Sequence, residues 1–372
     1  MTDDHLAFAA ALAALPVMGP ARLAALLGRW SPAEAWARVC AGGAAREESV
    51  RRTFRSQHEL ATGVAAWRAA AASVDPLDAW PRYRAAGVEV LLLGSREYPA
   101  ELATDPEAPA ALFVKGSLAA IDGPRVGIVG TRRCTHGGRE VARDLGHDLA
   151  AAGVRVVSGL AAGIDGAAHG GALAAAAAPP IGVVGSGLDV VYPKRHAALW
   201  ASVAEAGVLL SEAPLGARPE PWRLPARNRI IAALSDVVVV VESHARGGSR
   251  YTADEAIARG RTVMAVPGSV RSSAATFTNE LLAECCPPAR DATDVLVALG
   301  LAVPGERRAL VDSRPAPSVA DGVVLEQIGG DSVSLEQLVA CTGLDPVRVS
   351  VAIAHLEAAG WVGGDAGQWR RL

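Results

Sequence analysis

Glycine, hydroxyl and guanidinium groups follow a short apolar run in the segment GIVGTRR, residues 127–133. Gly130, Thr131 and Arg132 bring backbone N–H groups, a hydroxyl and a guanidinium together ahead of a helical stretch. Those are the donors that bind an anion. The segment lacks the GxGxxG spacing and no P-loop lysine follows it, so neither dinucleotide nor nucleoside triphosphate binding is indicated.

A second glycine-rich segment, SGLAAGID, begins at residue 158 and continues to AHGG. Asp165 and His169 lie four residues apart and could meet on one face of a helix. A hydrolytic interpretation would make them an acid–base pair. The alternative is that Asp165 caps the helix and His169 holds the loop, which we favour because no nucleophile or metal-ligand set accompanies them.

The third segment, GSGLDVVYPKRH, starts at residue 185 and ends in cations. Lys194 is one of only two lysines, beside 34 arginines, so compositional bias does not explain its presence. Tyr192 precedes it by two residues, and its ring could stack on a base or fill a gap in the core.

The fourth segment, LPARNRII, places two guanidiniums around an amide and leads through an apolar strand to GGSRYTA. Between positions 218 and 250 there are six arginines and three acids. A net positive cluster on strand-end loops is typical of a surface that binds a phosphate backbone, and the planar guanidinium makes paired hydrogen bonds to phosphate. The alternative is a set of surface ion pairs with the three acids. The polar residues of interest here are Arg227, Asn228, Arg229, Gly248, Ser249 and Thr252.

Alternating strands and helices are expected to position these segments. From residue 88, short runs of Val, Ile and Leu alternate with alanine-rich stretches of helical length. Such uninterrupted apolar runs are typical of a parallel sheet buried on both faces, and their spacing fits a doubly wound α/β fold, which binds ligands beyond the carboxyl ends of its strands. The predicted strands are 88–93, 112–114, 126–129, 154–157, 181–184, 208–210, 237–241 and 263–266.

Residues 1–75 are predicted to form a helical, helix-hairpin-helix-like domain, followed by the Rossmann-like domain over residues 76–300. The turn at 15–20 joins two short apolar segments; we expect Gly19 to free the backbone and Pro20 to open a helix. Such a turn can present N–H groups to a phosphate, or the helices can simply pack. We favour packing, since the two helices carry few basic residues.

A proline-containing linker over residues 301–320 and a small winged-helix domain over residues 321–372 complete the predicted organisation. In the winged helix, Asp345 is expected to cap the third helix, with Pro346 at its first position, and residues 361–369 to form the wing. This domain holds seven acidic residues and three arginines. Its net negative charge disfavours a transcription regulator that binds duplex DNA and favours binding to another protein.

The composition and the cysteine spacing argue against several classes of protein. The formal net charge of −3 excludes a globally basic nucleic-acid-coating protein but leaves room for a local basic groove. The five cysteines are scattered without a CxxC pair, which argues for a reducing cytosol and against a disulfide framework or a zinc site. The acidic N-terminus is unlike a signal peptide, and no apolar run reaches the roughly 20 residues that span a bilayer. We expect no cofactor and no metal.

The ordered motifs resemble those of the DNA processing protein A family, DprA/Smf, over about residues 88–300. They are GIVGTRR, SGLAAGID with AHGGAL, GSGLDVVYPK, SEAPLG, LPARNRIIAALS, VVVVVES, GGSRYTA and AVPG. The resemblance implies an extended Rossmann-like fold, flanked here by the helical and winged-helix domains. It also implies a cytoplasmic protein without catalytic activity that binds and protects single-stranded DNA, helps to load RecA, serves natural transformation, and forms a homodimer through the Rossmann-like domain.

Carried over by position, the resemblance implies that the phosphate-contacting arginine falls on Arg132, in the turn with Gly130 and Thr131. The basic residue after the tyrosine–proline pair falls on Lys194. The remaining DNA-binding positions fall on Arg227, Asn228, Arg229, Gly248, Ser249 and Thr252. Departures occur at Gly137, where the family often has an aromatic residue, and within 269–290, at Ala275, Phe277 and Cys285.

The main rival is an enzyme of the Rossmann-like nucleoside-monophosphate phosphoribohydrolase type. Such enzymes also set arginine and glycine loops at strand ends, but they rely on a Pro-Gly-Gly-x-Gly-Thr turn near a catalytic glutamate. The comparable place in this chain reads Leu224–Asn228, LPARN, without such a turn. The sequence therefore favours a DNA-binding protein over an enzyme.

Overall fold

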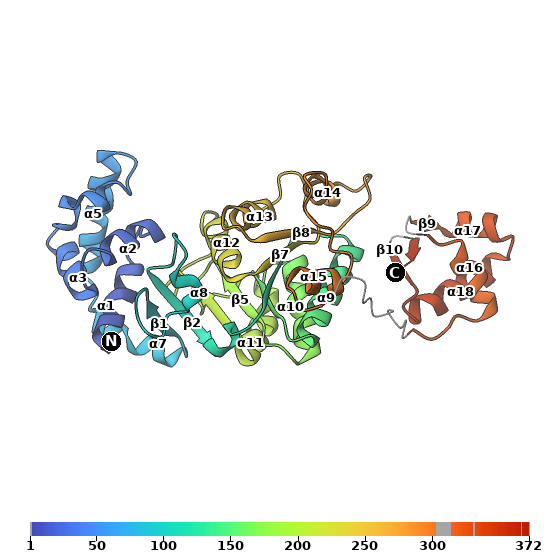
Figure 1. Cartoon of the computed structure of the whole chain (residues 1–372), viewed down its shortest axis with the longest axis horizontal. Helices are drawn as coiled ribbons and strands as arrows, with labels where there is room; N and C mark the ends of the chain where they lie inside the picture. Colours follow the sequence, from blue (N-terminus) through green and yellow to red (C-terminus); the bar gives the residue numbers. More distant parts are fainter. Residues whose placement is uncertain (1, 303–313, 330–331, 366, 372) are drawn as a thin grey trace. The chain divides into compact units, whose positions relative to one another are not determined.

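The chain folds into two compact units, Met1–Glu306 and Arg307–Leu372 (Figure 1). The computed structural model describes residues 2–302, 314–329, 332–365 and 367–371. Most of the predicted linker, 301–320, lies outside the described residues. No single helix in the described ranges is long and apolar enough to cross a membrane, although one bent pair, Leu335–Thr342 with Pro346–Ala358, passes that test by length and composition.

An eight-stranded sheet forms the centre of the larger unit. Its strands are β1 (Glu89–Leu92), β2 (Ala111–Gly116), β3 (Arg125–Val129), β4 (Arg155–Ser158), β5 (Ile181–Val184), β6 (Val208–Ser211), β7 (Val237–Val240) and β8 (Thr262–Ala265). They lie in the order β1-β2-β6-β5-β4-β3-β7-β8, and β3 to β8 pair in parallel. This arrangement confirms the predicted doubly wound α/β fold, and each strand lies within two residues of its predicted place.

Two strands at one edge depart from the predicted parallel sheet. β1 pairs antiparallel with β2, and β2 pairs antiparallel with β6. Leu112 and Phe113 of β2 are completely buried, as in the parallel strands. Burial on both faces therefore produced the same apolar run, and the prediction of parallel pairing was wrong for these two strands.

Helices cover both faces of the sheet (Figure 1). One face carries α9 (His136–Ala151), α10 (Ile164–Ala175) and α15 (Ala292–Ala298), and the other carries α12 (Arg223–Leu234), α13 (Ser249–Ala258) and α14 (Thr276–Ala283). Along β7, Val237 and Val239 belong to the first core, and Val238 and Val240 to the second. Successive side chains of a strand point to opposite faces, so both faces of β7 are buried.

The N-terminal helices pack against β1 and β2 in a core that also includes Trp200 and Val203 of α11 (Ala197–Ala206). These helices are α1 (Asp3–Ala13), α2 (Pro20–Leu27), α3 (Pro32–Cys40), α4 (Glu48–Arg51), α5 (Gln57–Ala71), α6 (Pro76–Ala79) and α7 (Pro81–Ala85); α8 (Ala100–Ala103) lies between β1 and β2. Pro20 opens α2 as predicted. The division of this unit at residue 75 stays a prediction.

The turn between α1 and α2 corrects one expectation. Its left-handed residue is Val17, with a φ of 52°, whereas Gly19 has a φ of −101°. The prediction that Gly19 supplies the conformational freedom was therefore wrong. Two side chains fix the strained turn from outside, since Arg22 donates to the Val17 carbonyl at 2.5 Å and Trp67 donates to the Pro16 carbonyl at 2.9 Å.

The smaller unit is the predicted winged helix. It contains α16 (Val319–Glu326), α17 (Leu335–Thr342), α18 (Pro346–Ala358) and a sheet of β9 (Val333–Ser334), β10 (Val362–Asp365) and β11 (Gln368–Arg371). The Asp345 carboxylate accepts a hydrogen bond from the Val347 N–H at 2.8 Å, and Pro346 occupies the first position of α18, as predicted. The hairpin of β10 and β11 forms the wing.

Candidate nucleic-acid interface

A cavity of about 550 Å³, here called the strand-end cavity, opens at the carboxyl ends of the parallel strands. The chain runs from β3 through β4 and β5 to β6 on one side of β3, and then crosses to β7 on the other side. Doubly wound sheets bind ligands at such a switch in strand order. Of the predicted site residues, eight line the cavity: Gly130, Thr131, Arg132, Arg227, Asn228, Gly248, Ser249 and Thr252.

The turn after β3 is held in one conformation by its neighbours. A side chain at Gly130 would place its Cβ 2.5 Å from Ile164 Cγ1 and 2.8 Å from the Glu242 carbonyl oxygen, so only glycine fits. The Thr131 N–H donates to that same carbonyl at 2.7 Å, and the Thr131 hydroxyl accepts from the Arg133 N–H at 3.2 Å. The backbone of the turn is therefore preorganised.

Arg132 extends from this turn as an exposed cation that also lines the cavity. Its guanidinium makes no hydrogen bond or salt bridge with any residue that the structure describes. An anion that enters the strand-end cavity can therefore bind this group without displacing a protein partner. The guanidinium supplies several N–H donors in one plane, which suits phosphate oxygens.

The Glu242 side chain supports the turn from below. Its carboxylate accepts hydrogen bonds from the Thr135 N–H at 2.8 Å and from the Thr135 hydroxyl at 2.7 Å. Thr135 in turn caps α9 by accepting from the Gly138 N–H at 3.0 Å. This carboxylate is thus engaged in holding the start of α9 and the preceding turn.

Arg227 forms an inner wall of the cavity and is only 7% exposed. Its guanidinium donates to the Val183 carbonyl and lies so close to Gly159 that a Cβ there would sit 2.1 Å from Nη1. Burial lowers the pKa of Arg227 to about 10, against the opposing effect of the nearby Asp165 carboxylate. Arg227 therefore stays charged at neutral pH, beside the Asp165 carboxyl group that also lines the cavity.

Asp165 and His169 are both buried beside this wall. Asp165 accepts from the Gly159 N–H at 3.2 Å, which ties the loop after β4 to the start of α10, and burial raises its pKa. His169 contacts the Asp165 carbonyl oxygen with Nδ1 and the Ile181 carbonyl oxygen with Nε2, both at 3.2 Å. Burial lowers the pKa of His169 to about 4, so the ring is neutral and donates to one of these carbonyls. These contacts agree with the loop-holding interpretation of His169. The prediction that Asp165 caps the helix was wrong, because Gly163 is the N-cap of α10 and the Asp165 carboxylate binds the Gly159 N–H of the preceding loop instead.

The start of α13 supplies further donors. Gly248 is the N-cap and is exposed, while Ser249 and Thr252 are buried in the cavity wall. Asn228 Nδ2 donates weakly to the Gly248 carbonyl at 3.4 Å. The buried Ser249 hydroxyl has no hydrogen-bond partner among the described residues. A helix N-terminus with an unsatisfied hydroxyl is a favourable place for an anion.

Two predicted site residues do not line the cavity. Arg229 makes a bidentate ion pair with Glu212 at 2.5 and 2.6 Å, and the side chains are only 11% and 14% exposed. Burial alone would lower the pKa of Arg229. The hydrogen bonds and the negative charge of Glu212 outweigh burial, so the pKa of Arg229 is raised. Lys194 is exposed in a short 3₁₀ helix, Lys194–His196, two residues after Tyr192, which does line the cavity.

Sequence reasoning missed two cavity residues whose side chains could contact a nucleic-acid strand and left a third undecided. Arg133 and Tyr251 line it but were absent from the predicted set, and Tyr192, for which stacking and core packing were both open, also lines it. Tyr192 is 41% exposed and Tyr251 is 57% exposed. The signal for Tyr251 was its position inside the GGSRYTA motif, directly between the selected residues Ser249 and Thr252.

The described residues contain no group of three or more His, Cys, Asp or Glu side chains that could hold a metal ion. The five cysteines are free thiols. The donor set of the strand-end cavity, made of guanidinium, hydroxyl, amide and backbone N–H groups, is suited to an anion and poorly suited to a cation.

Comparison with known families and proteins gives a consistent result. The model of the family described as DNA recombination-mediator protein A matches residues 89–300, and that of the DprA winged helix domain matches residues 309–368. The chain is 40% identical to DNA processing protein DprA of Bacillus subtilis over 189 residues, which is 50% of this chain and 63% of the relative. It is 34% identical to protein Smf of Escherichia coli over 284 residues, or 75% and 76% of the two chains.

The solved structures similar to this one include two DprA proteins. The DprA of Streptococcus pneumoniae superimposes with a TM-score of 0.65 at 28% identity, covering 80% of this chain and 98% of that one. The DprA of Helicobacter pylori, described for its unique single-stranded DNA binding mode, gives a TM-score of 0.50 at 28% identity, covering 57% and 95%. The chain spans just under two thirds of the length of the Bacillus relative and of a putative DprA of Mycobacterium tuberculosis.

Proposed function

The chain belongs to the DNA recombination-mediator protein A family, and from this we propose that it binds single-stranded DNA in DNA processing and recombination. The observation that carries the proposal is the strand-end cavity, where the unpaired guanidinium of Arg132 and the unsatisfied hydroxyl of Ser249 line one opening beside the charged wall of Arg227. Phosphate is the anion that such donors suit, and a nucleic-acid strand supplies phosphates in series.

Each predicted site residue has a part in this proposal. Arg132 and Lys194 contact phosphates directly, and Arg229 reaches the strand only where its pair with Glu212 opens. Arg227 supplies a buried positive charge. The backbone and side-chain donors around the opening are Gly130, Thr131, Asn228, Gly248, Ser249 and Thr252.

Exposed aromatic residues support a single strand over a duplex. Tyr192 and Tyr251 line the cavity with much of their surface accessible. Unpaired bases stack on aromatic rings, whereas the bases of a duplex are stacked on one another and out of reach. Because the cavity offers mainly phosphate donors and stacking surfaces, we expect little sequence specificity.

The finer roles rest on the family. In this proposal the protein acts in the cytoplasm, protects single-stranded DNA and helps to load RecA, as in natural transformation. It forms a homodimer through the Rossmann-like domain. The domain boundaries are residues 1–75, 76–300, 301–320 and 321–372. Two relatives are named as DNA processing proteins, one of them as putative, which supports a general role in DNA processing.

We also propose that the site binds without catalysing a reaction. The engagement of Glu242 with Thr135 and the structural contacts of Asp165 and His169 support this, because these acid–base side chains are occupied by hydrogen bonds that hold the turns around the cavity. Incubation of the protein with nucleoside monophosphates is expected to release no free base. Turnover that is lost in Glu242→Gln would establish the phosphoribohydrolase alternative instead.

The decisive experiment compares labelled single-stranded and double-stranded oligonucleotides of one sequence across a salt series, by fluorescence anisotropy. We expect tighter binding to the single strand and a steep loss of affinity with salt, as counterions are released from the strand. Equal or tighter binding to the duplex, or an affinity that salt does not change, would refute the proposed function.

A further inference from the structure

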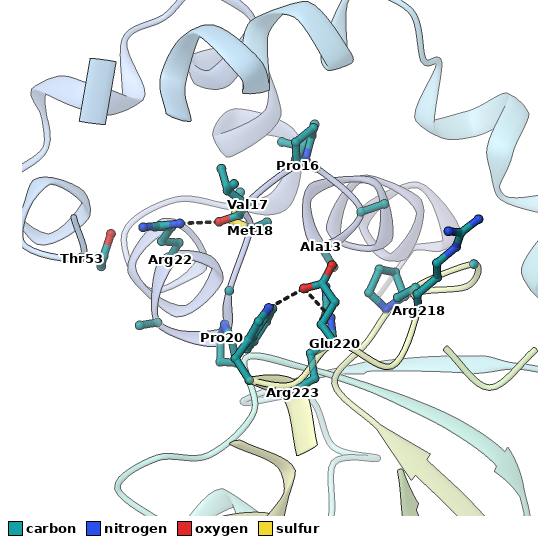
Figure 2. Close-up of a pocket in the computed structure, with 18 of the residues that line it drawn as sticks. Ala13, Pro16, Val17, Met18, Pro20, Arg22, Thr53, Arg218, Glu220 and Arg223 are labelled. Carbon is teal, nitrogen blue, oxygen red and sulfur yellow. Dashed lines mark hydrogen bonds and ion pairs between the residues drawn. The ribbon is translucent and has the colours of Figure 1, made fainter. Parts of the chain in front are cut away.

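A second and larger cavity, of about 900 Å³, lies between the turn that joins α1 to α2 and the loop 214–223 that follows β6. We call it the loop-side cavity. Figure 2 shows its two walls: Val17 of the turn and Arg22 of α2 lie on one side, and Arg218, Glu220 and Arg223 of the loop and the start of α12 lie on the other. None of the predicted site residues lines it.

The loop-side cavity is close to the strand-end cavity because one stretch of backbone lines both. Arg218, Glu220 and Trp222 line the loop-side cavity, whereas Pro219 and Pro221 line the strand-end cavity. The segment 218–222 forms the wall between the two cavities, and its successive residues line one cavity and the other in turn. A flexible strand that leaves one cavity therefore has to pass over only one segment of chain to enter the other.

Two arginines that line the loop-side cavity have no ion-pair partner among the described residues. Arg22 pairs with Glu59 at 2.6 Å, and Arg223 lies 3.7 Å from Glu220. Arg55 and Arg218 also line the cavity, are exposed, and make no side-chain hydrogen bond or ion pair within the described ranges. The cavity is thus net positive, with two guanidiniums available to an anion.

An oriented aromatic ring stands beside these cations. Trp222 is 43% exposed, its Nε1 donates to the Glu220 carboxylate, and the Arg223 guanidinium lies 4.4 Å from its ring centroid. These two contacts hold the indole in place while much of its surface remains accessible. Positive side chains next to an accessible aromatic ring are the combination that binds single strands, through phosphate contact and base stacking.

We propose that the loop-side cavity is a second binding site for the same DNA strand and takes the nucleotides that extend beyond the strand-end cavity. Arg55 and Arg218 contact phosphates, and Trp222 stacks a base. The inference rests on the proposed function, since it extends a strand already bound in the strand-end cavity. It gives the N-terminal helices a direct part in DNA binding, beyond the packing role that their sequence favoured.

The test measures binding of the full chain to labelled oligo-dT of two lengths, about 6 and about 20 nucleotides, the first near the lower end of the roughly 4–16 nucleotides of a single-strand site and the second beyond its upper end. The charge-reversed double variant Arg55→Glu with Arg218→Glu is expected to bind the longer strand about tenfold more weakly and the shorter strand as the parent does. Its salt slope on the longer strand is expected to be shallower by about 1.4, from two lost phosphate contacts.

Two further variants control for general effects. Arg82→Glu with Arg96→Glu reverses two exposed arginines that line neither cavity and is expected to bind both lengths like the parent. Trp222→Ala is expected to weaken only the longer strand, and Trp222→Phe to restore its binding. Thermal melting of each variant checks that the fold is intact.

The outcomes separate this inference from the proposed function. If Arg132→Ala weakens both lengths while Arg55→Glu with Arg218→Glu binds both like the parent, the loop-side cavity is not a DNA site although the strand-end cavity is. Equal loss on both lengths, or an equal loss in the Arg82 and Arg96 control, also overturns the inference. If Arg132→Ala leaves both lengths unchanged, the proposed function fails and this inference fails with it.

Discussion

Replacement of Arg132 by alanine separates a binding role from a structural one. The guanidinium is exposed and makes no hydrogen bond or ion pair among the described residues, so its loss removes no native contact. Its positive charge disfavours the charged form of Arg227, acting to lower the pKa of that group, and favours the charged form of Asp165, so removal relieves a repulsion and loses an attraction that oppose each other. We therefore expect the free energy of unfolding to change by less than about 0.5 kcal/mol.

The effect on binding is expected to be much larger. A hydrogen bond to a charged group contributes about 1.5–3 kcal/mol, and the loss of such contacts to a phosphate weakens affinity by roughly 10- to 150-fold. Fluorescence anisotropy with labelled oligo-dT across a salt series measures both the affinity and the salt slope. The slope should become shallower by about 0.7 for each lost phosphate contact on a single strand.

Arg51→Ala with Arg52→Ala is the matched control. Both residues are exposed, both lie near Glu48, at 3.7 and 3.1 Å, and neither lines the strand-end cavity. This control should bind like the parent. If a folded Arg132→Ala variant keeps the parental affinity while the control loses affinity, the DNA does not follow the strand-end cavity and the reasoning from unpaired cations is wrong.

Three other changes test the remaining parts of the structure. Arg227→Met leaves the buried Asp165 without its neighbouring positive charge and should lower the free energy of unfolding by about 3 kcal/mol in urea denaturation; an unchanged value would contradict a structural role. His169 has a folded pKa of about 4 against 6.5 when unfolded, so the unfolded chain binds the extra proton and about 3 kcal/mol of stability is lost as the pH falls from 6.5 to 4. His169→Gln should lack this part of the pH dependence, and an identical profile in both proteins would refute it. Deletion of residues 321–372 should change the affinity for single-stranded DNA by less than about tenfold, or 1.4 kcal/mol, since that segment is acidic; a larger loss would make it a DNA-binding arm.

The sequence was sufficient to locate the strands because their burial on both faces requires uninterrupted apolar residues. The sequence was not sufficient to predict that β1 and β2 pair antiparallel, because a fully buried antiparallel strand has the same apolar composition as a parallel one. The conformation of the turn before α2 was missed for a different reason. Val17 adopts its left-handed conformation in a turn where Arg22 of α2 donates to the Val17 carbonyl and Trp67 of α5 donates to the Pro16 carbonyl. The second contact joins residues 51 positions apart and is not local in sequence.

The candidate site shows the same division. The turn after β3 could be predicted because Gly130, Thr131 and Arg132 are consecutive and directly follow a strand. The ion pair of Arg229 could not be predicted, because its partner Glu212 is 17 residues away in the sequence. The loop-side cavity was also beyond prediction, since it arises only where the N-terminal helices meet the loop after β6.

Arginine content alone could not identify a DNA-binding surface in a chain with 34 arginines, but pairing and burial divide them into two groups. Arg229 and Arg259 are held by carboxylates and almost covered, so a phosphate could reach them only by breaking charged hydrogen bonds of about 1.5–3 kcal/mol each. Arg132, Arg55 and Arg218 make no side-chain hydrogen bond or ion pair among the described residues that a phosphate would have to break, and each lines a cavity. Association with a charged strand favours the cations that carry no such cost. The path of the DNA should therefore follow the unpaired arginines, from the strand-end cavity across the loop after β6 toward the N-terminal helices.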